Sequence, residues 1–471
     1  MSGCGGEKPP PPPARAPGRA ERLKAPLPKP NGLNLIVIVA DTWRTDYLGV
    51  YGGRKVPTPH LDRFAAEGVL FENAYADSLP TLPTRRVWQA GRSLLADKDP
   101  WWAAHDPEAV TIAEVLSKAG YYTGLIADTF HYFKPGMNFH QGYQTFEWIR
   151  GQESDAWIAG THRFDPSSHM PSHLVNEKYM AAMQQYMANT SGRKSEDDYF
   201  CAQTTAAAIR WLELRDARQP FFLWVDMFDP HEPWDAPPRF QKMVRPDYGY
   251  DRFLFGYGVR NEDIRESDYA VIRDLYAAEA AFSDFIIGRL LAKIDALGLR
   301  DDSIVVFASD HGTHLGELGC VQKTAGLCNS AIAHVPLIVR HPDRRFAGKR
   351  VRELVGAADY MPTFLSLLGI EGFPGLDGKN FWSLTAGGRN HERIFFGYGN
   401  FAAVRDQRWH YFQHFRGADP GKGPALYDLE ADPAEEHNVV ENHPDVVDER
   451  RALIADRFQA ELPAATPPRA G

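Results

Sequence analysis

Short apolar runs alternate with amphipathic segments from residue 33 to about residue 370. Four of these runs are β-branched and apolar at nearly every position, which predicts strands buried on both faces of a mostly parallel sheet. They are 33–41, 220–229, 302–310 and 335–340. Segments such as 111–120 and 276–298 have helical spacing. The pattern therefore predicts an α/β fold in which helices sandwich a large mixed, mostly parallel sheet.

After about residue 388 the apolar runs become shorter and richer in aromatic residues, as in "RIFFGYGN", "FAAVRD" and "WHYFQHF". Such runs predict a small antiparallel sheet, and 444–458 predicts a closing helix. We therefore expect three parts: an N-terminal tether over 1–31, a catalytic α/β domain over 32–388, and a small C-terminal α+β subdomain over 389–471.

The first 31 residues are rich in proline, glycine and charge and are predicted to be disordered or extended. No apolar signal region precedes Cys4, yet "SGCGG" before a proline-rich tether resembles the end of a bacterial lipoprotein signal. Two expectations stay open: a lipid anchor at Cys4 in the cell envelope or periplasm, or a cytoplasmic protein. No apolar stretch reaches the length of about 18 residues that a transmembrane helix needs.

Composition narrows the function further. The formal net charge is -9 and the folded part has no block of lysine or arginine, so no nucleic-acid partner is expected. Four cysteines do not make a disulfide framework, and none has the spacing of a zinc site. Cys320 and Cys328 either form one disulfide or are two half-buried thiols.

Acidic side chains stand at the ends of three predicted strands. Asp41 and Asp310 each close an apolar run, and a third run reaches Asp226 and then Asp229. Ligands of open α/β sheets bind at the carboxyl ends of strands, so these acids can share one site. With His311 beside Asp310, they make an oxygen and nitrogen set suited to Ca²⁺, Mn²⁺, Mg²⁺ or Zn²⁺. The alternative is a capped turn with a solvated histidine.

The stretch "TLPTRRVWQAGR" (81–92) predicts a helix with Pro83 in its first turn and Thr81 just before its N-terminus. Arg85 would lie on that first turn, where it can bind an anionic oxygen bidentately. Thr81 is therefore either a helix cap or a nucleophile activated by a metal. Because Thr84 can also serve as the cap, the nucleophile is favoured.

Motifs along most of the chain carry a resemblance. "VADTWRTDYLGVYG", "TLPTRRVWQAGR", "DPHEPWDAPPRF", "SDHGTHLGELG" and "LYDLEADPAEEHNV" resemble the landmarks of sulfatases in the alkaline-phosphatase-like superfamily. The resemblance implies one divalent metal ion held by Asp41, Asp310 and His311, with Thr81 completing the site. It also implies roles for three further residues: Arg85 supports the nucleophile, and His231 and Lys323 bind ester oxygens or protonate the leaving group. Without the resemblance, His231 reads as a loop histidine and Lys323 as a surface lysine.

Three departures from the family pattern change what the resemblance implies. Thr81 stands where sulfatases have the cysteine or serine that becomes formylglycine, so no formylglycine is expected. With a threonine as its nucleophile, the chain instead resembles the nucleotide pyrophosphatases and phosphoethanolamine transferases of the same superfamily. Thr42 replaces a second metal-binding aspartate. Asp128 and His131 stand near the positions of the lysine and histidine that grip sulfate in many sulfatases.

Three functional hypotheses follow. The first is a metal-dependent hydrolase of sulfate, phosphate or phosphonate esters, phosphodiesters included, with Thr81 as the nucleophile. The second is a phosphoryl transferase that forms the same phosphothreonine, and the third is an inactive binding protein. We expect calcium or manganese first, with zinc and magnesium as alternatives. The expected substrate is a small anionic ester, or a sulfated or phosphorylated glycan or lipid.

Overall fold

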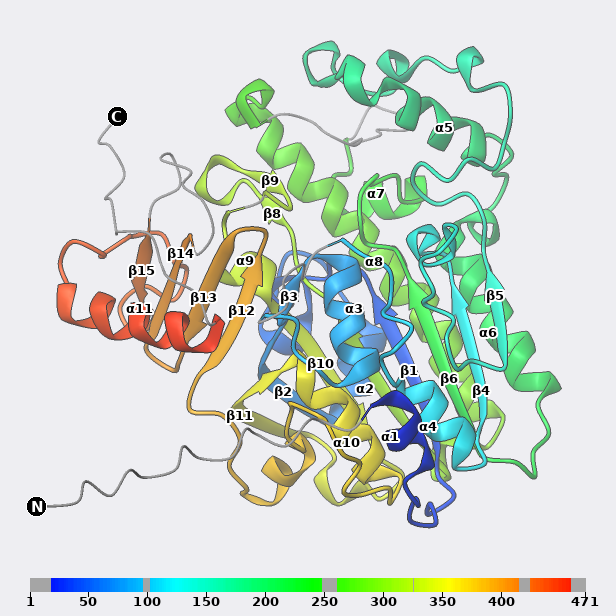
Figure 1. Cartoon of the computed structure of the whole chain (residues 1–471). Coiled ribbons are helices and arrows are strands. Elements are labelled where there is room, and N and C mark those ends of the chain that lie inside the picture. Colours follow the sequence, from blue (N-terminus) through cyan, green and yellow to red (C-terminus); the bar gives the residue numbers. More distant parts are fainter. Residues whose placement is uncertain (1–17, 96–101, 248–260, 325, 415–423, 459–471) are drawn as a thin grey trace, which may run out of the picture.

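An eight-stranded sheet runs through the centre of the computed structural model, which describes residues 18–95, 102–247, 261–324, 326–414 and 424–458 (Figure 1). Every neighbouring pair is parallel except those of the third strand in the order, which is antiparallel to both its neighbours. The mixed, mostly parallel sheet is therefore confirmed. In spatial order the strands are β11 (Lys349–Gly356), β2 (Val69–Tyr75), β10 (His334–Arg340), β7 (Ser303–Ser309), β1 (Asn34–Ala40), β6 (Phe221–Met227), β4 (Tyr122–Ala127) and β5 (Thr145–Trp148).

Helices cover both faces of this sheet because its central strands are apolar on both sides. In β1, Ile36 and Ile38 belong to one core cluster, whereas Leu35 and Val37 belong to the other. The first cluster lies beneath α2 (Pro59–Glu67), α6 (Phe200–Leu214) and α8 (Glu266–Ala296), and the second beneath α3 (Thr81–Ala90), α4 (Ile112–Lys118) and α10 (Tyr360–Leu367). The shorter helices are α5 (Met180–Thr190), α7 (Pro238–Val244) and α9 (Ser330–Ala333). Helix α8 begins at Glu266, earlier than the predicted residue 276.

A second sheet of five strands forms near the C-terminus. Its order is β15 (Ala425–Asp428), β14 (Trp409–His414), β13 (Phe401–Arg405), β12 (Ile394–Tyr398) and β3 (Ser78–Leu79). The first four strands pair antiparallel, as expected, and α11 (Pro444–Phe458) packs on them through Ile454 and Phe458. Strand β3 comes from the segment just before α3 and pairs parallel to β12. The small sheet thus holds the entrance to α3.

Residues 18–31 do not extend away from the molecule as a tether. They form α1 (Arg19–Lys24) and a segment that is hydrogen bonded to the α/β domain. Arg22 Nε donates to the Pro374 carbonyl over 3.0 Å, and Asn31 Nδ2 donates to the Leu367 carbonyl over 2.8 Å. Leu23 and Leu27 pack against the core. The proline-rich composition of the segment gave no indication of this apolar contact. Cys4 and the rest of 1–17 lie outside the described residues.

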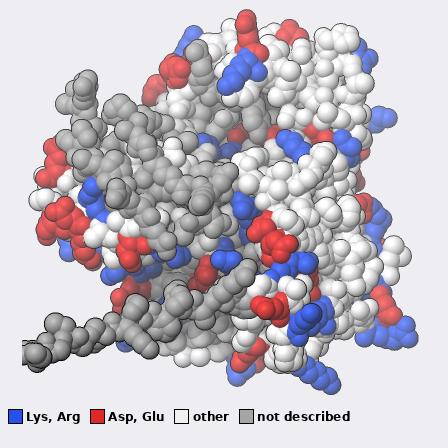
Figure 2. All heavy atoms as spheres, in the orientation of Figure 1, with Lys and Arg blue, Asp and Glu red and all other residues white. Residues whose placement is uncertain are grey.

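Two further expectations concern the surface and the cysteines. Lysine and arginine are interspersed with aspartate and glutamate over the face drawn in Figure 2. Among the described residues, no helix is both long enough and apolar enough to cross a membrane. Cys320 and Cys328 are both thiols, so the disulfide considered from the sequence is not formed.

The loop after β7 depends on one close approach of backbone to backbone, at Gly312. A Cβ atom there would lie 2.1 Å from the Ala331 carbonyl oxygen, and Gly312 N donates to the Ile332 carbonyl over 2.7 Å. The glycine is therefore required for packing rather than for a positive φ.

We predict that Gly312→Ala lowers the free energy of unfolding by about 1–3 kcal/mol, because the added methyl must displace the Ala331 backbone. Urea denaturation measures the change. Gly192→Ala is the matched control, since its added methyl meets nothing within 4 Å and its φ is not positive. Equal stabilities of the two variants would contradict the packing argument.

Candidate active site

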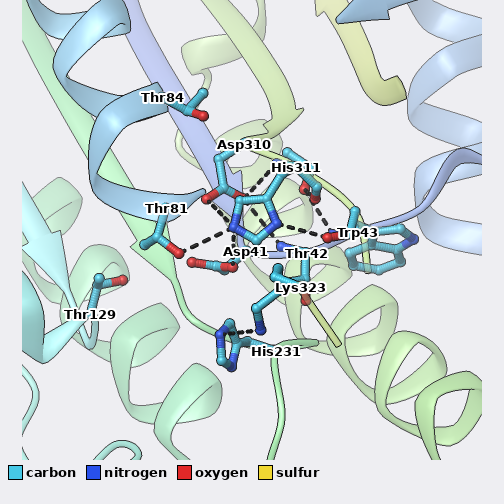
Figure 3. A network of polar contacts seen from close by, with 12 residues as sticks. Asp41, Thr42, Trp43, Thr81, Thr84, Thr129, His231, Asp310, His311 and Lys323 are labelled. Carbon is cyan, nitrogen blue, oxygen red and sulfur yellow. Dashed lines mark hydrogen bonds and ion pairs between the residues drawn. The ribbon is translucent and has the colours of Figure 1, made fainter. Parts of the chain in front are cut away.

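Three metal-ligating side chains meet where two central strands end. Asp41 follows β1, and Asp310 and His311 follow β7, which pairs with β1 in parallel register. One ligand atom from each of the three residues lies within 4.8 Å of those of the other two, and all three side chains are completely buried (Figure 3). The structure therefore brings together the three predicted ligands.

Thr81 reaches this cluster from the first residue of α3. Its Oγ1 lies 3.1 Å from His311 Nε2, and the side chain is almost completely buried (Figure 3). The helix begins at Thr81 itself, one residue earlier than expected, and Pro80 occupies the N-cap position without a capping side chain. Thr84 does not cap the helix either, because its hydroxyl donates to the Ser78 carbonyl over 2.6 Å. The Thr81 hydroxyl is thus directed at the cluster and does not cap the helix.

The hydrogen bonds of His311 fix which of its ring nitrogens carries a proton. Nδ1 lies 2.8 Å from the Gly312 carbonyl, which can only accept, so Nδ1 carries the hydrogen. Burial lowers the pKa of His311, and the ring is therefore neutral at neutral pH. Its Nε2 lone pair consequently points at the Thr81 hydroxyl, as needed to ligate a metal or to accept the hydroxyl proton.

Arg85 lies one turn after Thr81 and is completely buried among carboxylates. Its Nε and Nη2 donate to the two oxygens of Asp226 over 3.0 and 2.8 Å. Its Nη1 donates to Asp41 Oδ2 over 3.1 Å and also to Asp310. Burial opposes the charge, but Asp226 and Asp310 outweigh it and raise the pKa of Arg85 well above its usual range. We expected the guanidinium to bind an anionic oxygen bidentately, and its bidentate partner in the structure is the carboxylate of Asp226.

Asp226 is the site residue whose role the sequence did not reveal. Besides Arg85, its carboxylate accepts hydrogen bonds from Thr129 over 3.1 Å, Tyr132 over 2.7 Å and Trp224 over 3.0 Å. Asp226 lies within β6, a strand buried at every position. A charged side chain in a fully buried strand must be paired with an opposite charge. An aspartate inside an otherwise apolar run was therefore the sequence signal for the role of Asp226.

The balance of charge in this core fits a divalent cation. One guanidinium, that of Arg85, faces the carboxylates of Asp41, Asp226 and Asp310, which leaves an excess of two negative charges. Burial and the neighbouring Asp310 raise the pKa of Asp41 well above its usual range. Its Oδ1 is buried and has no hydrogen-bond partner. Two carboxylates, an imidazole and a hydroxyl are a donor set that a hard divalent cation accepts.

The backbone at Thr42 helps to hold Asp310 in place. Thr42 has a φ of 61°, which is uncommon for a β-branched residue. In this conformation its N–H donates to Asp310 Oδ1 over 3.1 Å, and its carbonyl accepts from Tyr276 over 2.7 Å. Thr42 thus contributes its backbone at the position where many sulfatases have a second aspartate, and strain of this kind is typical of functional sites.

His231 and Lys323 approach the cluster from two loops and contact each other. Lys323 follows β9 (Val321–Gln322), which pairs with β8 (His314–Leu315), and its Nζ lies 2.7 Å from His231 Nε2 (Figure 3). His231 Nδ1 donates to the Glu232 carbonyl over 2.6 Å, so Nε2 accepts from the ammonium group. Burial and the charge of Lys323 hold the pKa of His231 well below its usual range. The proton of this pair therefore belongs to Lys323.

Asp128 and His131 are not part of this cluster. Asp128 Oδ1 accepts from the Phe228 N–H over 2.7 Å, and burial together with Asp229 raises the pKa of Asp128 well above its usual range. His131 Nε2 lies 2.8 Å from Glu153. Asp229 accepts from Gln152 over 3.0 Å. Asp229 and His131 therefore contact the 152–153 segment, and Asp128 contacts the backbone of Phe228.

Comparisons with known proteins agree with this arrangement. The family model "Sulfatase" matches residues 33–370, and the model "N-sulphoglucosamine sulphohydrolase, C-terminal" matches residues 316–458. The human iduronate 2-sulfatase is 28% identical over 67% of this chain, and the match spans 60% of the human protein. An arylsulfatase of Clostridium perfringens is 25% identical over 90% of this chain and 94% of its own length. The crystal structure of a phosphonate monoester hydrolase of Agrobacterium radiobacter has a TM-score of 0.72 at 24% identity, covering 91% of this chain and 96% of that one.

We predict that Asp226→Asn lowers the free energy of unfolding by about 3–5 kcal/mol, because it removes one partner of a buried ion pair. Chemical denaturation measures the loss. Asp216→Asn is the control: Asp216 also binds an arginine, Arg218, through two contacts, but this pair is exposed to water and its loss should change little. Similar effects of the two substitutions would show that Asp226 does not anchor Arg85.

Proposed function

Because the chain belongs to the sulfatase family and is an ester hydrolase of that family, we propose that its nucleophile is the hydroxyl of Thr81. The observation that carries the proposal is the contact of Thr81 Oγ1 with His311 Nε2, inside the group formed by Asp41, Asp310 and His311. A buried hydroxyl that caps nothing and points at such a group has no structural task that explains its position.

Asp41, Asp310, His311 and Thr81 would hold one divalent cation, with calcium or manganese proposed first. When bound, the cation favours the ionised hydroxyl and offsets the charge of the ester oxygens. Arg85 limits how many carboxylate oxygens are available, because its Nη1 already contacts Asp41 Oδ2. Asp41 Oδ1, which has no partner, is the oxygen that remains.

The chain's own residues then account for two chemical steps. In the first, the bond from Thr81 Oγ1 to the phosphorus or sulfur atom forms while the bond to the leaving oxygen breaks. The hydroxyl proton is released to solvent when Thr81 ionises, because the Nε2 lone pair of His311 would be held by the cation. The leaving oxygen takes a proton from Lys323, since His231 is neutral and its Nε2 lone pair is occupied by that ammonium group. In the second step the oxygen of a water molecule bonds to the phosphorus or sulfur atom while the bond to Thr81 Oγ1 breaks, and the neutral amine of Lys323 takes up the water proton.

Threonine favours phosphorus esters over sulfate esters. The aldehyde hydrate of typical sulfatases releases sulfate by collapsing to the aldehyde, and a threonine cannot follow that path. A phosphothreonine can be hydrolysed by water attacking phosphorus beside a metal. We therefore propose that phosphate and phosphonate esters are cleaved faster than sulfate esters, although the named relatives include an iduronate 2-sulfatase and an arylsulfatase.

We predict that the p-nitrophenyl esters of phosphate and phenylphosphonate, and bis-p-nitrophenyl phosphate, are hydrolysed in the presence of calcium or manganese. Thr81→Ala should lower kcat by at least about 10³-fold, because no other nucleophile is available, while Thr81→Ser should retain activity. Nitrophenol release measures the rate, and a phosphate label retained on native protein but not on Thr81→Ala identifies the intermediate.

Thr84→Ala is the matched control for Thr81→Ala. It removes a threonine from the next turn of α3, where the hydroxyl bonds only to the Ser78 carbonyl, so kcat should change little. Cleavage of sulfate alone would contradict the preference for phosphorus esters. Transfer of the label to an added alcohol faster than to water would indicate the transferase, and no turnover with any metal would indicate a binding protein.

Lys323→Ala should slow esters with basic leaving groups more than p-nitrophenyl esters, because only a basic leaving group needs the proton that Lys323 donates. The loss of kcat/KM on a phenyl ester should be about 10²-fold or more, and smaller on the p-nitrophenyl ester. Lys349→Ala, an exposed lysine at the start of β11, serves as the control. An equal loss on both esters would mean that Lys323 binds the ester and does not act as its acid.

A further inference from the structure

Glu232 is a buried carboxylate beside the candidate active site that the two chemical steps do not use. It follows His231 in the loop after β6 and is 3% exposed. Its Oε1 accepts a hydrogen bond from Lys323 Nζ, and its Oε2 is buried without a hydrogen-bond partner. Because water screens a buried charge only weakly, the charge of Glu232 acts on any anion that approaches Lys323.

Glu232 and Lys323 together carry no net charge. An ester oxygen that reaches Lys323 therefore meets a hydrogen-bond donor but little net positive charge. The adjacent imidazole adds none, because burial and the charge of Lys323 hold the pKa of His231 well below its usual range. The loop after β4 contributes His131, whose Nε2 lies 2.8 Å from Glu153 and so already has an acidic partner.

The remaining buried charges around Thr81 are balanced once a divalent cation is bound. Arg85 faces three carboxylates, and this group has an excess of two negative charges, which the proposed cation offsets. Ionisation of Thr81 then adds one further negative charge. Among the buried side chains that the structure describes here, no positive charge is left over to offset a second negative charge on the substrate.

We propose that Glu232 makes the site selective for phosphorus esters that carry a single negative charge, namely phosphodiesters and phosphonate monoesters. The inference rests on the proposed function, in which the ester is one of phosphorus. A phosphate monoester carries two negative charges above its second pKa of about 6. The second charge would be buried beside Glu232 without a cation of its own, which is costly. A diester is the larger of the two ions, so a preference for it cannot come from lack of space.

The binding test compares dimethyl phosphate, with one negative charge, and methyl phosphate, with two, at pH 8. Isothermal titration of Thr81→Ala in the presence of calcium or manganese, at equal ionic strength, measures both affinities without turnover. We expect dimethyl phosphate to bind at least about tenfold more tightly. Adding Glu232→Gln should tighten dimethyl phosphate about tenfold and methyl phosphate about a hundredfold, because the repulsion that is removed scales with the charge of the ligand.

Turnover provides a second measurement on the chain with Thr81 intact. We expect kcat/KM at pH 8 to be higher for methyl p-nitrophenyl phosphate than for p-nitrophenyl phosphate, and Glu232→Gln should lower this ratio about tenfold. Glu232→Asp keeps the charge and should keep most of the preference, which a merely structural role would not explain. Glu213→Gln is the matched control, since Glu213 also pairs with a lysine, Lys293, but at the surface, and it should leave the ratio unchanged.

Three results would overturn the proposal. The first is methyl phosphate binding as tightly as dimethyl phosphate while Glu232 is intact. The second is an equal change in both affinities with Glu232→Gln, and the third is the same shift with Glu213→Gln. If Glu232→Gln does not fold, the two affinities of the parent protein still decide. If no phosphorus ester is turned over, the proposed function fails, whereas the affinities still test Glu232, because binding needs no nucleophile.

Discussion

The buried guanidinium of Arg85 is the charge on which the candidate active site depends. Removing an arginine from water costs several kcal/mol, and only good geometry with several partners offsets that cost. Here the partners come from the carboxyl ends of three adjacent strands, β6, β1 and β7. Asp226 takes one edge of the guanidinium completely, so only Nη1 remains for the other two carboxylates. The side chains of the cluster are thus arranged around a cation that the protein itself supplies.

That arrangement also fixes the proposed nucleophile. Thr81 and Arg85 are four residues apart on α3, so they lie on one face of the helix, and anchoring Arg85 sets the height and rotation of Thr81. A second restraint on α3 comes from β3, which directly precedes the helix and pairs with β12 of the small sheet. The C-terminal sheet therefore helps to position Thr81 without contributing a side chain to the cluster. A helix restrained both at Arg85 and just before its first residue suits a hydroxyl that must meet His311 Nε2.

The sequence predicted which residues lie in the candidate site better than it predicted which of them bind one another. The strands carrying Asp41 and Asp310 were evident because a run buried on both faces has few other interpretations, and strand ends of one sheet must converge. The partner of Arg85 was not evident, since the same apolar run reaches both Asp226 and Asp229. The sequence does not show that the strand ends at Met227, with Asp226 inside β6 and Asp229 in the loop after it. Residues 18–31 were misjudged for a related reason: two leucines among prolines are enough to dock a segment when the surface that receives them is made elsewhere in the chain. Whether Thr81, His231 and Lys323 act as proposed stays a prediction.

The proposed threonine nucleophile is best understood together with the charges that surround it. An inactive protein would gain no stability from three buried carboxylates around one arginine. Replacing such a buried ion-pair network with apolar residues often leaves the free energy of unfolding unchanged or raises it. The cluster has a buried Asp41 oxygen without a hydrogen-bond partner, which is costly unless something binds there, beside a His311 lone pair directed at the Thr81 hydroxyl. A threonine ester must also be released by attack of water at the central atom, which phosphorus permits far more readily than sulfur beside a metal. A threonine nucleophile and the charges around it are therefore consistent with one another if the ester is one of phosphorus.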